Sequence, residues 1–162
     1  MSYYIEKQDY RNLGQSNLLI SPITLGTMTF GEQNTEAEAF LQLDWAISHG
    51  INFIDTAEMY PVPPKENTFT ATEIIIGNWL KKQKRDDIVL ATKAAGPRRS
   101  LHWIRNGPKA FDEKNFRAAL EGSLKDFKQI ILICISSTGP KEMCLCLANT
   151  NLIQAVKWKV QN

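Results

Sequence analysis

The stretch GINFIDTAEMY, residues 50–60, joins an apolar run to an acid, Asp55, and to a phenol, Tyr60. Residues 51–57 are too few for an amphipathic helix, and their apolar side chains are typical of a strand that is covered on both faces. We therefore predict a buried strand that ends at the acid. The tyrosine follows in the next loop, so one short stretch indicates both the kind of sheet and the position of a site.

The segments upstream predict a hairpin, a strand and a helix. Residues 10–20 have turn-forming residues between two short apolar pieces, which indicates a β-hairpin. SPITLGTMTFG, residues 21–31, begins β-branched and apolar and then turns to glycine and small residues, which indicates a strand leading into a loop. Thr35 and Glu38 have the spacing of a capping box, so a helix should begin there and end at the histidine–glycine pair before residue 51.

The segments downstream repeat this alternation. Thr70 and Glu73 have the spacing of a second capping box, ahead of an apolar segment that ends in lysines. DIVLATK, residues 87–93, predicts a third strand. Residues 111–127 have apolar side chains at helical spacing, with Asp112 as the expected N-cap.

Strands that alternate with helices and short loops require a parallel sheet with right-handed crossovers. Two architectures have this pattern, the doubly wound sheet and the eight-stranded barrel. Neither the dinucleotide fingerprint G-x-G-x-x-G nor a phosphate-binding loop follows the first strand, which disfavours the doubly wound sheet. We therefore predict an α/β fold: an incomplete (β/α)8 TIM barrel with about three βα units after an N-terminal hairpin.

Composition excludes several classes of function. The chain has 162 residues, 43% of them hydrophobic and 22% charged, with a formal net charge of +2. This balance predicts a soluble cytoplasmic protein with neither nucleic acid nor a membrane as its partner. Cys134, Cys144 and Cys146 lack the spacing of a metal site, so no metal is expected.

The candidate catalytic residues lie at and just after the ends of the predicted strands. Asp55 ends one predicted strand and Lys93 ends the next, and neighbouring parallel strands lie roughly 5 Å apart, so a carboxylate and an ammonium can pair there. An ordinary phenol has a pKa of about 10, and a nearby cation favours its ionised form. Tyr60 beside Lys93 would then be a general acid for a carbonyl that is being reduced. The alternative is that Asp55 caps a turn while Lys93 and Tyr60 are ordinary surface and packing residues.

Three segments in order resemble a known family. LGQSNLLISPITLGTMTFG, GINFIDTAEMY and DIVLATKAAGP are similar to the N-terminal half of the aldo-keto reductases, nearest their bacterial Tas-like branch. The resemblance covers residues 10 to about 127. It implies a (β/α)8 barrel and a catalytic role for Asp55, Tyr60 and Lys93, with the tyrosine as proton donor to an aldehyde or ketone.

The resemblance also implies a cofactor. NADPH would be the hydride source, held by the backbone of Gly26, Thr27 and Met28, with Asp55 near its nicotinamide ribose. The family's fourth catalytic residue is a histidine after the fourth strand, and this sequence has none at that position. His102 precedes the third helix, and we interpret it as a loop residue.

The composition shifts after residue 127. We predict that residues 1–127 are the N-terminal part of the barrel and that residues 128–162 form an aberrant tail without family resemblance. A shifted reading frame over residues 126–140 can spell the family's fourth-strand signature, histidine included, so we hypothesise a frameshifted product. The apolar run of residues 130–135 is then the candidate for a substitute fourth strand.

Two alternatives to an active reductase follow from this tail. One is a catalytically inert, truncated family member or a relative that binds the nucleotide without turnover. The other is assembly of two such chains into one barrel, because an open sheet edge is a template for pairing with another chain. The small carbonyl substrate and the oligomeric state are left open by the sequence.

Overall fold

The computed structural model describes residues 4–97, 101–106, 110, 112–128, 134–137 and 145–146, the last two ranges by their backbone alone. The order of elements alternates strands and helices, as predicted. The elements in chain order are β1 (Arg11–Asn12), β2 (Leu19–Ile20), β3 (Thr24–Gly26), α1 (Glu36–Ser48), β4 (Phe53–Asp55), α2 (Ala71–Leu80), β5 (Val89–Ala94), α3 (Glu113–Asp126), β6 (Cys134–Ser137) and β7 (Leu145–Cys146).

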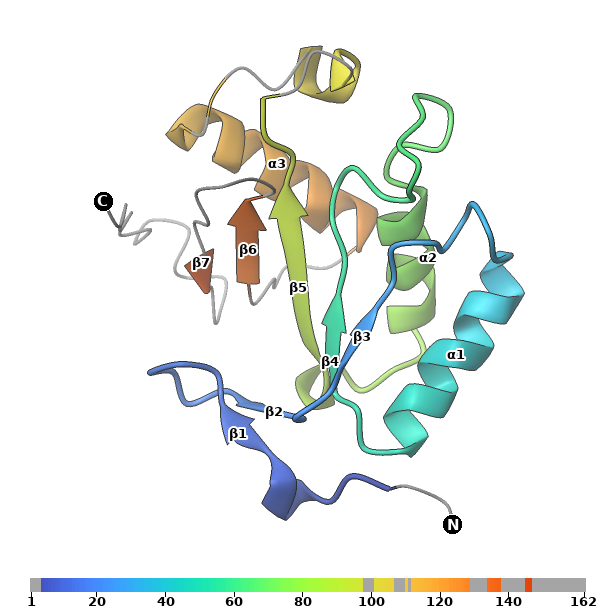
Figure 1. The fold of residues 1–162 in the computed structure, drawn as a ribbon, viewed down its shortest axis with the longest axis vertical. Coiled ribbons are helices and arrows are strands. Elements are labelled where there is room, and N and C mark those ends of the chain that lie inside the picture. Colours follow the sequence, from blue (N-terminus) through green and yellow to red (C-terminus); the bar gives the residue numbers. More distant parts are fainter. Residues whose placement is uncertain are drawn as a thin grey trace.

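One sheet organises this part of the chain. Its strands have the order β3-β4-β5-β6-β7, with parallel pairing from β3 to β6 and antiparallel pairing of β7 on β6. In Figure 1 the parallel strands run upward, so their carboxyl ends lie together at the top. The predicted set of three βα units of an incomplete barrel is therefore confirmed.

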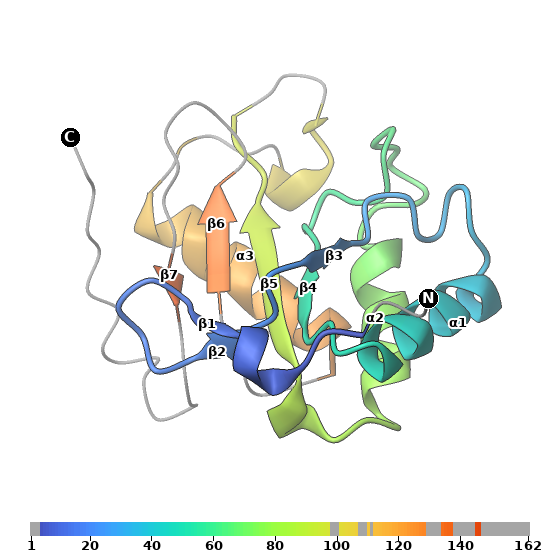
Figure 2. The ribbon, with the colours of Figure 1, turned by 60° about the horizontal axis from the view of Figure 1, so that its bottom comes forward.

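The N-terminal hairpin lies at the opposite end of the sheet. Strands β1 and β2 pair antiparallel, as predicted, and they cross beneath the amino ends of the parallel strands (Figures 1 and 2). Asn52 fastens the hairpin, because its side-chain amide donates to the Leu19 carbonyl at 3.0 Å and its side-chain oxygen accepts from the Ser21 N–H at 2.7 Å.

The fourth parallel strand, β6, overlaps the end of the candidate segment. Residues 130–135 were the expected strand; β6 spans Cys134–Ser137, and residues 130–133 lie outside the described part. The register pairs Ala91 with Cys134 and Lys93 with Ser136. The sequence of β6, CISS, contains no acid, base or histidine.

Two of the three predicted helix caps are confirmed. The Glu38 N–H donates to the Thr35 hydroxyl at 3.3 Å, and the Thr35 N–H donates back to the Glu38 carboxylate at 2.8 Å, which completes the capping box of α1. The Asp112 carboxylate accepts from the Asn115 N–H at 2.8 Å at the start of α3. Gly50, with φ of 82°, ends the first helical segment in a conformation that glycine adopts easily.

The capping box predicted for α2 is wrong. Thr70 has left-handed backbone angles, with φ of 63°, and its side chain makes no capping hydrogen bond. Glu73 is fully buried and accepts a hydrogen bond from the Thr92 hydroxyl on β5 at 2.5 Å. The reason is tertiary: residue 73 lies on the face of α2 that packs on the sheet, so its carboxyl meets a strand instead of its own helix terminus.

The hydrophobic core lies between the sheet and its helices. Ile54 and Leu90 point from the strands toward the helical layer and are almost completely buried. The helices contribute a buried set comprising Leu43, Ile75, Ile76, Trp79, Leu80, Phe116, Ala119 and Leu120. The Trp79 indole N–H also donates to the Asp44 carboxylate at 2.7 Å, which links α2 to α1. This layer holds the strands in register and so positions their carboxyl ends.

The close approach of α2 to the end of α3 gives a test of this packing. A methyl group at Gly77 would lie 2.3 Å from the Asp126 carbonyl oxygen and 2.7 Å from the Phe127 Cα, so Gly77→Ala should lower the free energy of unfolding by about 1–3 kcal/mol. Gly122 on α3 has no neighbour within 4 Å of such a methyl, so Gly122→Ala should raise the free energy by about 0.5–1 kcal/mol. Urea denaturation of both variants measures the difference, and equal effects would contradict the packing.

Glu73 gives a pH-dependent test. Burial raises the pKa of its carboxyl to about 8, against a hydrogen bond from Thr92 that lowers it. The folded protein therefore keeps a proton that the unfolded chain loses near pH 4.5, and the stability from this group is full below that pH and declines as pH rises toward 8. The difference in free energy of unfolding between wild type and Glu73→Gln should change with pH. As pH rises across this window, the wild-type value should fall relative to the variant by at most about 1.4 kcal/mol per pH unit. Parallel pH profiles for the two proteins would refute a buried neutral carboxyl.

Candidate active site at the carboxyl edge of the sheet

The structure brings the predicted acid and cation together. Asp55 is the last residue of β4, and Lys93 lies near the end of the neighbouring strand β5. The Lys93 Nζ donates to the Asp55 carboxylate and, at 2.8 Å, to the Thr56 carbonyl. The side chains are 20% and 34% exposed for the lysine and the aspartate, so the pair is partly shielded yet reachable from outside.

Tyr60 lies beside this pair. The Lys93 Nζ is 5.2 Å from the centroid of the Tyr60 ring, within the range of a cation–π contact. The Tyr60 N–H donates to the Ala57 carbonyl at 3.0 Å, which curls the loop after β4 back over the strand end. The three residues predicted from the sequence thus form one cluster: a carboxylate, an ammonium and a phenol.

The segment Gly26–Met28 lies against the same cluster. Gly26 pairs in register with Asp55, and a Cβ built on Gly26 would meet nothing within 4 Å, so the space beside it is open. Thr27 is fully buried, and both its N–H and its hydroxyl donate to the Asp55 carbonyl, at 3.1 and 2.9 Å. Met28 is 48% exposed. Thr27 therefore holds the backbone of Asp55, while Gly26 and Met28 border open space.

A second ion pair beneath the loops was missed by the sequence analysis. Glu58 is 4% exposed, and its carboxylate accepts from the Arg105 guanidinium and from the Ala95 N–H, the latter at 2.5 Å. Burial raises the pKa of the Glu58 carboxyl, and the Arg105 guanidinium opposes that shift. Glu58 lies inside the motif quoted first, but its partner is far along the chain, and no local spacing predicts the contact.

Neither histidine joins the cluster. His49 stacks on Trp45 with ring centroids 3.9 Å apart, at the end of α1. His102 is exposed and meets Trp103 edge-on at 5.1 Å, in the turn before α3, as interpreted from the sequence. The site therefore lacks the histidine that the resemblance associates with the fourth strand.

The described residues contain no group of three or more histidine, cysteine, aspartate or glutamate side chains able to hold a metal ion. None of their helices combines the length and the apolar character needed to cross a membrane.

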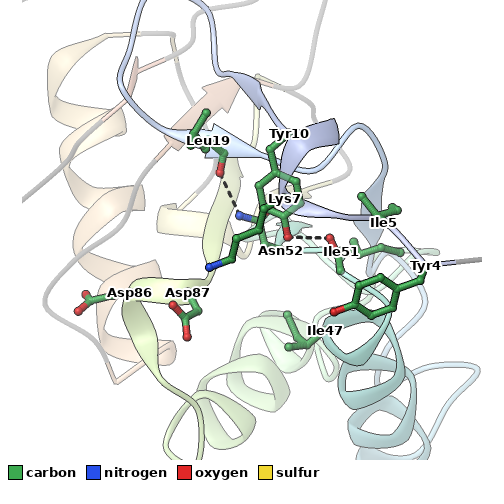
Figure 3. Close-up of a pocket in the computed structure, with 11 residues that line it drawn as sticks. Tyr4, Ile5, Lys7, Tyr10, Leu19, Ile47, Ile51, Asn52, Asp86 and Asp87 are labelled. Carbon is green, nitrogen blue, oxygen red and sulfur yellow. Dashed lines mark hydrogen bonds between the residues drawn. The ribbon is translucent and has the colours of Figure 1, made fainter.

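A cavity of about 380 Å³ lies at the other end of the sheet, between the hairpin and α1. Figure 3 shows Tyr10 closing one side, its hydroxyl donating to the Gly50 carbonyl at 2.8 Å, with Ile47 below and Asp86 and Asp87 opposite. This cavity lies at the amino ends of the strands, so it is separate from the cluster of Asp55.

The parallel βα units are those of part of a β/α barrel, and the polar cluster lies at their carboxyl edge, where barrels of this fold usually carry their sites. The sequence model described as "Aldo/keto reductase family" matches residues 22–131. The chain belongs to the aldo/keto reductase family. The match ends a few residues past the predicted boundary at residue 127.

Individual relatives agree with this assignment. The chain is 50% identical over 117 residues to Protein tas of Escherichia coli, covering 72% of this chain and 34% of that protein. It is 38% identical over 119 residues to the uncharacterized oxidoreductase YrpG of Bacillus subtilis, covering 72% and 36%. The chain thus spans about a third of the length of these curated relatives.

Solved structures show the same fold. An aldo-keto reductase from Pseudomonas aeruginosa superimposes with a TM-score of 0.67 at 26% identity, covering 85% of this chain and 49% of that one. The holo form of aldo-keto reductase AKR11C1 from Bacillus halodurans superimposes with a TM-score of 0.63 at 26% identity, covering 80% and 39%. The observed sheet is therefore part of an aldo-keto reductase barrel.

Proposed function

We propose that the cluster of Asp55, Lys93 and Tyr60 is the proton-donating centre of an NADPH-dependent reductase of small aldehydes or ketones. The single observation that carries this proposal is the Lys93 ammonium, which contacts both the Asp55 carboxylate and the Tyr60 ring. A cation so placed stabilises negative charge on the phenol oxygen as the proton leaves. Asp55 and the Thr56 carbonyl keep the ammonium oriented.

The residues around the cluster fit a dinucleotide cofactor. Gly26 leaves open space directly beside the Asp55 strand end, and the partly exposed Asp55 carboxylate can accept hydrogen bonds from ribose hydroxyls. Met28, also exposed, offers an apolar contact, whereas the donors of Thr27 are already used within the protein. We therefore assign cofactor contacts to Gly26, Met28 and Asp55, with Thr27 acting through the backbone of Asp55.

The reaction balances with these groups. NADPH would supply a hydride to the carbonyl carbon and become NADP⁺. Tyr60 would give its hydroxyl proton to the carbonyl oxygen, which becomes the alcohol, while Lys93 stabilises the phenolate until a proton is taken up from solvent. The phenol hydroxyl makes no hydrogen bond to any other described residue, so it can turn toward a substrate.

Substitution of the phenol tests this proposal. With a panel of small aldehydes and NADPH deuterated at C4, the chain should form alcohol that carries deuterium, and Tyr60→Phe should lower kcat by about 10²- to 10⁴-fold because the proton donor is lost. NADPH binding, followed by nucleotide fluorescence, should persist in the variant.

Tyr4→Phe is the matched control, because Tyr4 is 62% exposed and lines the cavity at the other end of the sheet. It should leave turnover unchanged. Nucleotide binding without alcohol formation by wild type would instead support a nucleotide-binding relative, and the absence of both would identify an inert chain.

A further inference from the structure

The buried ion pair of Glu58 and Arg105 joins the loop after β4, which carries Tyr60, to the segment after β5. The Arg105 guanidinium contacts the Glu58 carboxylate and also donates to the Ala95 carbonyl at 3.1 Å. Glu58 accepts from the Ala95 N–H at 2.5 Å. The pair therefore fastens the loop after β4 to the chain just beyond β5, and none of its atoms is used in the proton transfer proposed above.

Backbone contacts attach the Glu58 segment to β5. The Glu58 N–H donates to the Lys93 carbonyl at 3.1 Å, and the Thr56 N–H donates to the Ala91 carbonyl at 2.9 Å. In sequence, Glu58 lies between Asp55 and Tyr60. The backbone of Glu58 therefore stays hydrogen-bonded to β5 beyond the end of β4. Its side chain adds a contact to Ala95, just after β5.

The conformation of Arg105 indicates that its contacts are held firmly. Its backbone lies in the left-handed region, with φ of 50°, which is unfavourable for a bulky side chain and persists only where surrounding contacts hold it. In the same segment Leu101 and Ile104 are buried in a small apolar cluster, and Met59 from the loop after β4 packs against that cluster. The side chains of Arg105 and Glu58 are only 13% and 5% exposed, and charges so shielded from water attract each other more strongly than exposed charges do.

We propose that Glu58 and Arg105 are positioning residues that hold the Tyr60 loop over the Lys93 ammonium. Tyr60 follows Glu58 by two residues, so release of the Glu58 side chain frees the loop that carries the phenol. Lys93 stays attached to Asp55 and Thr56 through its own hydrogen bonds. That this position of Tyr60 matters for catalysis rests on the proposed function. That Glu58 and Arg105 hold the loop in this position does not.

The first variant of the test replaces the pair without leaving a lone buried charge. The double variant Glu58→Met/Arg105→Met fills similar volume with apolar side chains, a change that proteins often tolerate. Its matched control is Glu113→Met/Arg117→Met, which removes an exposed pair on α3 with a separation of 3.0 Å. Glu58→Gln, nearly the same shape as the native side chain, is the second variant.

The first readout does not depend on activity. In wild type and in the control, NMR should show a nuclear Overhauser effect between the Tyr60 ring protons and the Lys93 ε-methylene protons. The effect should vanish or weaken strongly in Glu58→Met/Arg105→Met and weaken less in Glu58→Gln, whose amide oxygen can still accept from Ala95 and Arg105 without the charge, while the methyl signals of Ile54 and Leu90 keep their native shifts. Retention of the full effect in a folded variant would overturn the proposal, and so would unfolding of both variants, because the pair would then support the whole fold.

The second readout separates the two proposals. If wild type reduces aldehydes, the double variant should lose about tenfold or more in kcat with an unchanged dissociation constant for NADPH. Unchanged kcat would overturn the positioning role. If wild type shows no turnover, the proposed function fails alone, and the NMR comparison decides the role of Glu58 and Arg105.

Discussion

The parallel register of β3, β4 and β5 is the constraint from which the rest of the structure follows. It pairs Gly26 with Asp55 and Asp55 with Ala91, so three consecutive strands end at one edge. Lys93 lies two residues beyond Ala91 and can reach across to the carboxylate. The ammonium then has a carboxylate, a backbone carbonyl and an aromatic ring around it, and each restricts where the charge can lie.

Two buried glutamates show how the fold treats charge on the two sides of this sheet. Glu73 lies in the helical layer, faces the sheet and meets the neutral hydroxyl of Thr92, so burial dominates and raises the pKa of the carboxyl to about 8. Glu58 lies under the loops and meets the Arg105 guanidinium, which opposes the same effect of burial. The helical side thus contains a carboxyl that burial keeps neutral, and the loop side contains an ion pair.

The described sheet has two edge strands, β3 and β7, whereas a closed barrel has none. Among the described residues, β3 pairs with β4 alone, and β7 runs antiparallel on the far side. Ile23 and Met28, on either side of β3, are 55% and 48% exposed. The part matched here covers 49% and 39% of the two solved structures, so the proposed reductase activity is first a property of such complete barrels. For this chain it is tested directly.

The sequence by itself determined the elements whose signals are local. The caps at Thr35 and Asp112 depend on groups three residues away, and the Asp55–Lys93 pair follows from strand order once the sheet is known to be parallel. Tertiary structure decided the rest. The Glu73 carboxyl bonds to Thr92 on a strand instead of capping its helix, and the Glu58 carboxylate pairs with a guanidinium 47 residues away. The physical reason is burial: a carboxyl without water needs a partner within the protein, and the tertiary fold determines which group is near.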